Sequence, residues 1–325
     1  GGIKGDVPFG TLTTIHESPL KFGLLYVGSD DGLVHVTKDG GNTWMRITDG
    51  LPENLWVSRV QASRFDEGTV YLALNGYRWD DFTPYVYKST DFGASWERIG
   101  TELPLEPVND IKEDPVNPNL LYVGTDHGLY VSFDGGDSFM QMAEGLPAVA
   151  VHDVEIHPEA HHLLVGTHGR SIYKADVSDM QQLHDTIFQQ DIYAFGMDDM
   201  RHSGYWGRQR ASWSEPYEPE MMIPYFGKMG GETTFAVKTV GEDAITLAKW
   251  TSDVSKGLNY EQYDLQVSEE AARAYEKMLN ADKEGETIEL EKADNGAYYL
   301  RPGNYTVEIS QGGNTTTTTL TLTER

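Results

Sequence analysis

Residues 37–44 read TKDGGNTW, and two close copies of this octapeptide follow, STDFGASW at 89–96 and SFDGGDSF at 132–139. All three fit one pattern: a small hydroxyl residue, any residue, Asp, any residue, Gly, any residue, Ser or Thr, and an aromatic residue. Their aspartates lie 52 and 43 residues apart. A repeat with this period is typical of β-propellers and other repeat arrays.

A second marker has the same period. A Leu-Pro pair follows each octapeptide, at residues 51–52, 103–104 and 146–147, and these pairs are also 52 and 43 residues apart. Two short strands precede each octapeptide, one follows it, and another alternating segment follows each Leu-Pro pair. Four short strands per unit describe one antiparallel propeller blade. The sequence therefore predicts an all-β fold in which residues 1–177 form a partial β-propeller.

We interpret the octapeptide as the turn between the third and fourth strands of a blade. The Asp carboxylate can accept backbone N–H bonds across the turn, Gly supplies the positive φ, and the aromatic residue packs between blades. A calcium site is the competing interpretation, but an EF-hand needs further acidic positions and a distal Glu that these segments lack. The residues expected to have this structural role are Asp39, Gly41, Trp44, Asp91, Gly93, Trp96, Asp134, Gly136 and Phe139.

The composition excludes several classes of protein. The chain of 325 residues has 25 Lys and Arg against 51 Asp and Glu, a formal charge of -26, which repels nucleic acid and anionic membrane surfaces. It has no Cys, so disulfides and thiolate metal sites are excluded. No apolar run approaches the length of a membrane-spanning helix. The start at Gly1 without a charged and apolar leader indicates that a signal peptide is absent or already removed. We expect no cofactor and no metal ion.

A fourth unit begins at Val151 and stops early. Apolar segments follow at 163–167 and 171–174, but no octapeptide and no fourth strand come after them. About three and a half blades would leave two open edges, which is a liability in solution. We infer that the chain is the C-terminal part of a larger propeller, whose other blades are absent from the sequence or supplied by another polypeptide. Two copies that pair into one ring are the alternative.

The octapeptides resemble the Asp-box (BNR) repeats of sialidases, two-propeller xyloglucanases, photosystem assembly propellers and sortilin-type propellers. The segments LYVGT at 121–125 and THGRSIY at 167–173 most resemble the large sortilin-like "glycosyl hydrolase" proteins of Bacteroidetes-type bacteria. This resemblance covers residues 11–177. It implies an extracytoplasmic protein, secreted, periplasmic or on the outer-membrane surface of a Gram-negative bacterium. It implies no single activity, because the family includes hydrolases, receptors and assembly factors.

A ligand or partner site is expected at the turns between second and third strands, on the face opposite the octapeptides. In the second blade this turn holds an insertion, NGYRWDDFTPY at 75–85, with the composition of a carbohydrate or protein contact surface. A loop that packs over the channel or against a neighbouring domain is the alternative. The candidate residues are Asp30, Asp31, Tyr77, Arg78, Trp79, Asp80, Asp81, Tyr85, Asp126, His127, His168 and Arg170.

The same face carries few groups suited to catalysis. Its aspartates could supply the acid and the nucleophile or base of a glycosidase, but acidic residues are abundant throughout the chain. A sialidase would also need an arginine triad and a Tyr–Glu pair, and only Arg78 and Arg170 can be placed on this face. The histidines at 157, 161 and 162, with Glu159, fall on a turn and are expected to be solvated. The sequence assigns no catalytic residue.

The second half of the chain has a different pattern. Residues 178–222 are predicted to be an aromatic-rich connector that packs on the propeller. Residues 223–325 are predicted to form an antiparallel β-sandwich with strands at 232–240, 244–250, 287–291, 297–300, 305–310 and 315–323. One helix interrupts it, with Ser268 as N-cap and Leu279 near its end. Residues 257–264 resemble the Ig-like modules that follow such propellers, including those similar to the flagellar hook-capping protein, with Tyr263 where many have Trp.

Two functional classes are consistent with these patterns. The first is an extracytoplasmic binding or scaffold protein, part of a larger chain or assembly. Its partners would be the remaining blades or another chain that completes the ring, an outer-membrane or cell-surface protein complex, or a glycan. The second is a sialidase- or xyloglucanase-like glycoside hydrolase with a site shared with the missing blades. The incomplete ring and the lack of an assignable acid and nucleophile favour the first.

Overall fold

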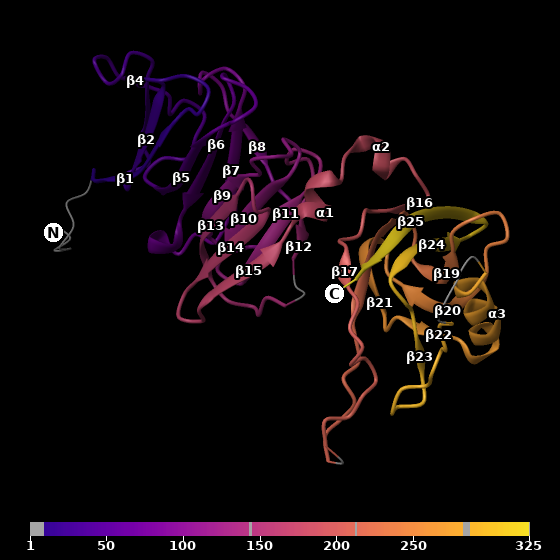
Figure 1. Cartoon of the computed structure of the whole chain (residues 1–325). Coiled ribbons are helices and arrows are strands. Elements are labelled where there is room, and N and C mark those ends of the chain that lie inside the picture. Colours follow the sequence, from indigo (N-terminus) through magenta and orange to yellow (C-terminus); the bar gives the residue numbers. More distant parts are fainter. Residues whose placement is uncertain (1–9, 143–144, 212, 282–286, 325) are drawn as a thin grey trace. The chain divides into compact units, whose positions relative to one another are not determined.

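The computed structural model describes residues 10–142, 145–211, 213–281 and 287–324. Strands dominate throughout, and the chain divides into two compact units, Gly1–His184 and Asp185–Arg325 (Figure 1). Each unit is described by itself.

The first unit contains four antiparallel sheets, called blades 1 to 4 in chain order. Blade 1 consists of β1 (Leu12–Glu17), β2 (Leu25–Ser29), β3 (Val34–Thr37) and β4 (Met45–Arg46). Blade 2 consists of β5 (Trp56–Ala62), β6 (Val70–Asn75), β7 (Tyr85–Ser89) and β8 (Glu97–Ile99), with the 3₁₀ turn η1 (Tyr77–Trp79) after β6. Blade 3 consists of β9 (Val108–Glu113), β10 (Leu121–Thr125), β11 (Gly128–Ser132) and β12 (Met140–Gln141). Blade 4 consists of β13 (Val151–His157), β14 (His162–Thr167) and β15 (Ile172–Asp176).

The blades pack one on the next through their first strands. In Figure 1 they follow one another along the first unit, and β5 packs beside β1, β9 beside β5 and β13 beside β9. The first strands β1, β5, β9 and β13 are called the inner strands below. The predicted all-β fold with four-stranded, propeller-like blades is confirmed. Blade 4 has three strands, since β15 is followed by helix α1 (Ser178–Gln182).

Each octapeptide forms the turn between the third and fourth strands of its blade. In blade 1 the Asp39 carboxylate accepts bonds from the Thr43 N–H at 2.9 Å and the Thr43 hydroxyl at 2.6 Å. The Thr37 hydroxyl donates to Asp39 at 2.8 Å and accepts from the Gly41 N–H at 2.9 Å. Blades 2 and 3 repeat these four bonds. These hydrogen bonds lower the pKa of Asp39 to about 2, so the turn holds its aspartate ionised.

The same turn also joins a blade to the one before it. The Trp96 indole N–H donates to the Ile47 carbonyl oxygen at 2.7 Å, and Gly93 lies against the Ile47 side chain. Phe139 likewise packs into the core shared by blades 2 and 3. Trp44 occupies the equivalent position in blade 1 and is 44% exposed, because the described residues include no blade before it.

The second unit is a two-sheet β structure around one core. One sheet has the order β16 (Ile192–Ala194), β18 (Met221–Gly227), β21 (Gly257–Tyr263). The other has the order β17 (Met200–Arg201), β25 (Asn314–Thr323), β24 (Gly303–Gln311), β19 (Gly231–Thr239), β20 (Thr246–Val254). A short pair, β22 (Gln266–Val267) and β23 (Tyr298–Tyr299), and the helices α2 (Asp185–Phe188) and α3 (Glu269–Leu279) complete it. Both sheets and α3 contribute to the core, for example through Tyr225, Phe235 and Tyr275. Ser268 caps α3 by accepting from the Ala271 N–H, as predicted.

The predicted connector 178–222 is divided between the two units. Its first part, α1, packs on the propeller: the Gln181 amide donates to Asp114 at 2.9 Å, and the Asn117 amide donates to the Leu183 carbonyl at 2.7 Å. From residue 185 onward the chain belongs to the second unit, where β17 pairs with β25 and Trp206 lies in the core. The second unit therefore begins at residue 185 and not at 223.

Five strands of the second unit went unpredicted, namely β16, β17, β18, β21 and β22. β18 contains Pro224, which cannot donate to a sheet, and β21 alternates weakly, so neither has a strong strand pattern. The strand predicted at 287–291 does not form.

The contact between the octapeptide and the preceding blade gives a stability test. A Cβ on Gly93 would lie 3.2 Å from Ile47 Cβ, which no rotamer change can move away. Gly93→Ala is expected to destabilise the first unit by about 1–3 kcal/mol more than Gly41→Ala, measured by urea denaturation. Gly41 is the matched control, because it has the same place in its turn and a φ of 94°, but its Cβ would approach only Trp44, at 3.9 Å. Equal losses for both variants would contradict this packing.

Candidate functional site

The turns between second and third strands hold the predicted site residues. Asp30 and Asp31 follow β2, Asp126 and His127 follow β10, and residues 168–171 follow β14. The insertion of blade 2 lies at the equivalent place, between β6 and β7. These turns all lie at the end of their blades opposite the octapeptides, because antiparallel strands reverse direction at each turn.

Asp30 and Asp31 are tied to their own blade. Asp30 is buried and accepts bonds from the Gly10 N–H at 2.7 Å and the Thr11 N–H at 2.8 Å. Asp31 accepts a short hydrogen bond from the Ser29 hydroxyl. Both carboxylates therefore stabilise the edge of blade 1, and Asp30 is inaccessible to a substrate.

The insertion is an ordered loop with exposed rings. Its chain closes where the Asp81 N–H donates to the Gly76 carbonyl at 3.2 Å, and a Cβ on Gly76 would lie 2.7 Å from the Asp81 carbonyl oxygen. Tyr77 packs edge-on against Phe82 with ring centroids 6.4 Å apart. Tyr77, Trp79 and Phe82 are all exposed, so the loop presents an aromatic surface to solvent.

Among the charged residues of the insertion, Asp81 is held by hydrogen bonds within the loop. The Asp81 carboxylate accepts from the Thr83 N–H at 3.0 Å and from the Tyr85 hydroxyl at 2.9 Å. Burial alone would raise the pKa of Asp81, but these hydrogen bonds outweigh it and hold the pKa below its ordinary value. Arg78 lies over the ring of Trp56, 5.3 Å from its centroid, and Asp80 is exposed.

The remaining candidates are only partly brought together. Asn75, at the base of the insertion, donates to Asn109 at 2.9 Å, and Asn109 donates to Asp126 at 3.0 Å, which links the loops of blades 2 and 3. His127 lies 3.5 Å from Glu106. In blade 4 the rings of His152 and His168 are 5.4 Å apart. Arg170 is exposed.

The inner strands carry a polar network that the sequence analysis did not identify. Each inner strand has a β-bulge at the same point, so that Thr14, Arg59, Asp110 and Asp153 occupy equivalent places opposite Gly28, Ala73, Gly124 and Gly166. Two residues further on, His16, Gln61, Lys112 and Glu155 form a second equivalent set. Two layers of polar side chains therefore run from blade to blade.

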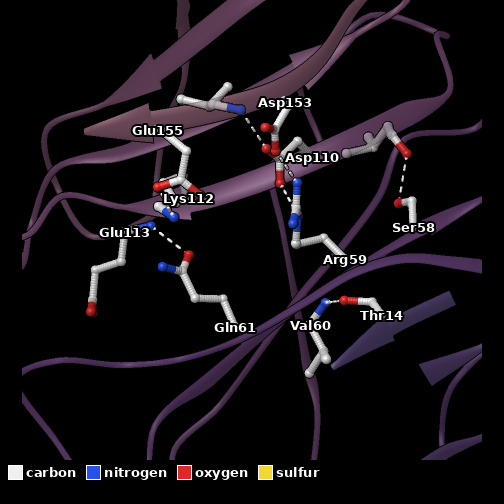
Figure 2. A network of polar contacts seen from close by, with 12 residues as sticks. Thr14, Ser58, Arg59, Val60, Gln61, Asp110, Lys112, Glu113, Asp153 and Glu155 are labelled. Atoms are coloured by element: carbon white, nitrogen blue, oxygen red, sulfur yellow. Dashed lines mark hydrogen bonds and ion pairs between the residues drawn. The ribbon is translucent and has the colours of Figure 1, made fainter. Parts of the chain in front are cut away.

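Side chains that can accept a hydrogen bond take one from the backbone of the next blade. The Val154 N–H donates to Asp110 at 2.7 Å, and the Glu113 N–H donates to Gln61 at 2.8 Å (Figure 2). The Ala62 N–H donates to His16 Nδ1 at 3.1 Å. Burial lowers the pKa of His16, which keeps the ring neutral and able to accept.

Arg59 and Lys112 carry only donors, and each meets an acid from the next blade instead. Figure 2 shows Arg59 between Asp110 and Asp153, with its Nε 2.5 Å from Asp110 and its Nη2 in a short ion pair with Asp153. Lys112 lies 2.7 Å from Glu155. Arg59 thereby joins blade 2 to blades 3 and 4, which start 52 and 95 residues after β5 begins.

The only signal for this network in the sequence is the presence of charged residues within the predicted inner strands. Arg59 stands between Ser58 and Val60, and Asp110 stands between Asn109 and Ile111. Charged residues are seldom fully buried without a partner, so their recurrence at one strand position indicates mutual pairing.

The described carboxylates do not form an obvious acid and nucleophile pair. Burial raises the pKa of Asp110 to about 6, the direction a general acid requires, although Arg59 and the Val154 N–H oppose the shift. However, the Asp110 side chain is fully buried. Asp81, which is more exposed, has a lowered pKa and accepts hydrogen bonds from Thr83 and Tyr85.

The described residues contain neither a metal-binding cluster nor a membrane-spanning helix. Among residues 10–142, 145–211, 213–281 and 287–324, no group of three or more His, Cys, Asp or Glu side chains is arranged to hold a metal ion. No helix within these ranges is long and apolar enough to cross a membrane.

No protein-family model matches this chain, and no curated protein matches its sequence. Its structural neighbours are β-propeller proteins. The structure described as YCF48 bound to D1 peptide is 15% identical with a TM-score of 0.37, over 79% of this chain and 70% of that one. The GH74 xyloglucanase from Xanthomonas campestris is 11% identical with a TM-score of 0.42, over 96% and 47%. An ancestral GH74 enzyme is 13% identical with a TM-score of 0.43, over 97% and 41%. The chain thus spans less than half the length of these two GH74 enzymes.

The buried ion pair of the inner strands gives a pH-dependent prediction. Asp110→Asn is expected to destabilise the first unit by about 3 kcal/mol, because it removes the buried partner of Arg59. Burial disfavours the ionised carboxylate more than Arg59 favours it, so the pKa of Asp110 is about 6 when folded and about 3.9 when unfolded. Protonation of Asp110 therefore stabilises the folded state relative to the unfolded one, an effect that is fully present below pH 4 and is lost as the pH rises through 6. The variant should therefore lose more relative to wild type at pH 5 than at pH 8.

The control is Asp153→Asn, because the Asp153 side chain is 58% exposed and its pairing is screened by solvent. Its loss should stay below about 1 kcal/mol at both pH values. Denaturation curves that show a smaller loss for Asp110→Asn at pH 5 than at pH 8 would contradict the assignment.

Proposed function

We propose that this chain is an extracytoplasmic binding or scaffold protein of the Asp-box, sortilin-like type. Its propeller is completed by further blades, in the same polypeptide or in another. One observation carries the proposal: apolar side chains that are buried between blades everywhere else are exposed on the two outermost blades.

The outer face of blade 1 exposes two aliphatic side chains. Leu12 is 64% and Ile15 is 63% exposed. The equivalent positions in blades 2 to 4 are all 0% exposed, because each packs on the preceding blade. They are Val57, Val108 and Val151 for Leu12, and Val60, Ile111 and Val154 for Ile15.

The outer face of blade 4 repeats this in the other direction. Ile172 is 71% exposed. Its equivalents on the third strands of blades 1 to 3 are 0% exposed, because the following blade covers them: Val34, Val86 and Leu129. A further blade beside blade 1 and another beside blade 4 would therefore cover these apolar side chains, as neighbouring blades do at the equivalent strand positions.

Covering these faces is energetically favourable. Burial of one such aliphatic side chain contributes roughly 1.5–3 kcal/mol. Large exposed apolar areas on a folded unit typically mark interaction surfaces. Further blades suit these faces best, because a blade presents the complementary pattern of strand positions on its own opposite face.

The insertion of blade 2 provides a second exposed apolar surface. Tyr77, Trp79 and Phe82 are exposed on a loop whose backbone is fixed by hydrogen bonds. Exposed aromatic residues on a rigid loop are favourable anchors for a protein partner or a glycan, because little conformational entropy is lost on binding. We propose this loop, with Asp126, His127, His168 and Arg170 on the equivalent turns of blades 3 and 4, as the partner face.

The cellular setting is proposed from the family resemblance of the octapeptides. The octapeptides resemble repeats of extracytoplasmic proteins, and we propose an extracytoplasmic setting for this chain. Its partner would then be a cell-surface or outer-membrane protein complex, or a glycan.

The alternative is a glycoside hydrolase with a site shared with further blades. Asp80 and Asp81 lie on the insertion among aromatic residues, as a sugar-binding cleft would require. Against this reading, the pKa of Asp81 is lowered and its carboxylate is engaged by Thr83 and Tyr85.

The proposal predicts that the isolated chain associates. Native mass measurement at micromolar concentration is expected to show species heavier than the 36.3 kDa chain. Ile15→Glu should shift this distribution to the monomer without lowering thermal stability appreciably, because Ile15 is exposed within the chain itself. Phe22→Glu, at a 95% exposed position of the same blade, should leave the mass unchanged. A stable wild-type monomer would refute the proposal.

The hydrolase alternative has its own test. The chain is expected to release no product from aryl glycosides, sialosides or xyloglucan oligosaccharides. Turnover by the wild type that Asp80→Ala or Asp81→Ala abolishes, with folding intact by circular dichroism, would establish the hydrolase and overturn the scaffold assignment.

A further inference from the structure

The second unit contains a pocket of about 1000 Å³. One wall is formed by residues of the stretches 202–210 and 214–217, between β17 and β18, and the other by residues of the stretch 290–301, which includes β23. Pockets of this size accommodate small ligands or a few units of a polymer.

The two walls are held together by backbone contacts. The Asn295 N–H donates to the Gly207 carbonyl at 3.0 Å, and the Gln209 N–H donates to Asp294 at 2.9 Å. Gly207 has a φ of 71°, and a Cβ there would lie 2.6 Å from Ala293 Cβ and from a ring carbon of Tyr299. The glycine therefore permits a close approach of the walls, and the pocket is built into the fold.

The charge of the pocket is unlike that of the chain. Four basic residues line it, Arg208, Arg210, Lys292 and Arg301, against three acidic ones, Glu215, Glu291 and Asp294. In the whole sequence acidic residues outnumber Lys and Arg by 51 to 25. The pocket lining thus carries one more positive than negative charge, whereas the whole chain is strongly acidic, so an anionic ligand is repelled less here than elsewhere on the protein.

Two of these cations have no partner within the described residues. Lys292 pairs with Glu269 at 2.7 Å, and Arg301 donates to the Glu289 carbonyl at 3.2 Å. Arg208 and Arg210 form no ion pair or side-chain hydrogen bond with the residues that the structure describes, and both are exposed at the pocket. Their guanidinium groups are free to bind a carboxylate in the bidentate manner.

Aromatic rings complete the lining. Trp206 and Tyr299 are buried at the base, with ring centroids 6.1 Å apart, and Tyr205 and Tyr217 are exposed. Flat rings beside hydrogen-bonding groups suit a ligand that has both apolar ring faces and polar edges.

We propose that this pocket binds an acidic oligosaccharide, a glycan that contains uronic acid units. Arg208 and Arg210 bind the sugar carboxylates, and Tyr205 and Tyr217 pack on the sugar rings. Ser203, Gln209, Glu215 and Glu291 provide the donors and acceptors that hydroxyl groups need. An acidic peptide would match the arginines but would leave most of these hydroxyl-binding groups unused.

This inference does not depend on the proposed function of the propeller, because the pocket is formed entirely by the second unit. If the first unit proved not to associate with further blades, the pocket proposal would still hold. If the pocket bound no ligand, the proposal for the exposed faces of blades 1 and 4 would be unaffected.

The test is calorimetric titration of the whole chain with a tetramer of galacturonic acid at low ionic strength. Binding is expected, and it should weaken as NaCl is added. The fully methyl-esterified tetramer, which has the same rings without charge, should bind at least about tenfold more weakly. Arg208→Gln and Arg210→Gln should each reduce affinity by about tenfold or more, since a hydrogen bond to a charged group has roughly this effect.

Arg273→Gln is the matched control, because Arg273 is exposed on α3 of the same unit and does not line the pocket. It should leave the affinity unchanged, and all variants should unfold at the wild-type temperature. Absence of binding at millimolar tetramer, equal binding of the ester, or binding unaffected by both pocket variants would overturn the proposal. Equally tight binding of an oligoglutamate peptide with the same dependence on Arg208 and Arg210 would assign the pocket to acidic peptides instead.

Discussion

A blade of this propeller has two apolar faces and cannot bury either of them alone. Neighbouring blades bury these faces. On one face of blade 2, Val60 is fully buried against blade 1, and on the other face Val86 is fully buried against blade 3. Blade-on-blade packing therefore holds the first unit together. It also explains why Ile15 and Ile172 are exposed, since no described blade covers the outermost faces.

Polar groups are arranged to serve the same packing. The octapeptide turns stabilise each blade through an ionised aspartate at the surface, and Trp96 extends one of them to the carbonyl of Ile47 in the preceding blade. On the inner strands, hydrogen-bond acceptors take backbone N–H groups of the next blade, whereas the donors Arg59 and Lys112 require acids there. A buried strand position can thus be polar if the neighbouring blade supplies the complementary group.

The second unit buries its apolar residues in a different way from the first. It buries a single core between two sheets and the helix α3, and the segment after residue 185 supplies part of that core through Ile192 and Trp206. This segment returns to the sheets through β18, and its residues at 202–210 and 214–217 form one wall of the pocket. Gly207 fixes that wall against residues 293–299, and the cationic pocket is the result.

The sequence by itself determined the blades, because turn chemistry is local. Asp39, Gly41 and Thr43 make their bonds within one octapeptide, so the pattern of residue types was enough to place the turns, the strands around them and the missing fourth strand of blade 4. The capped helix at 269–279 was predictable for the same reason. The insertion of blade 2 was located by the change of period alone.

Only the tertiary structure decided the contacts between distant segments. Arg59 meets Asp110 and Asp153 because bulges set the register of three separate inner strands, and no local pattern specifies that alignment. The allocation of residues 185–222 to the second unit has the same origin. An aromatic residue such as Trp206 is expected to be buried, but the sequence does not show which elements will cover it. Local hydrogen bonding is encoded within a few residues, whereas burial and charge pairing depend on which surfaces the fold brings together.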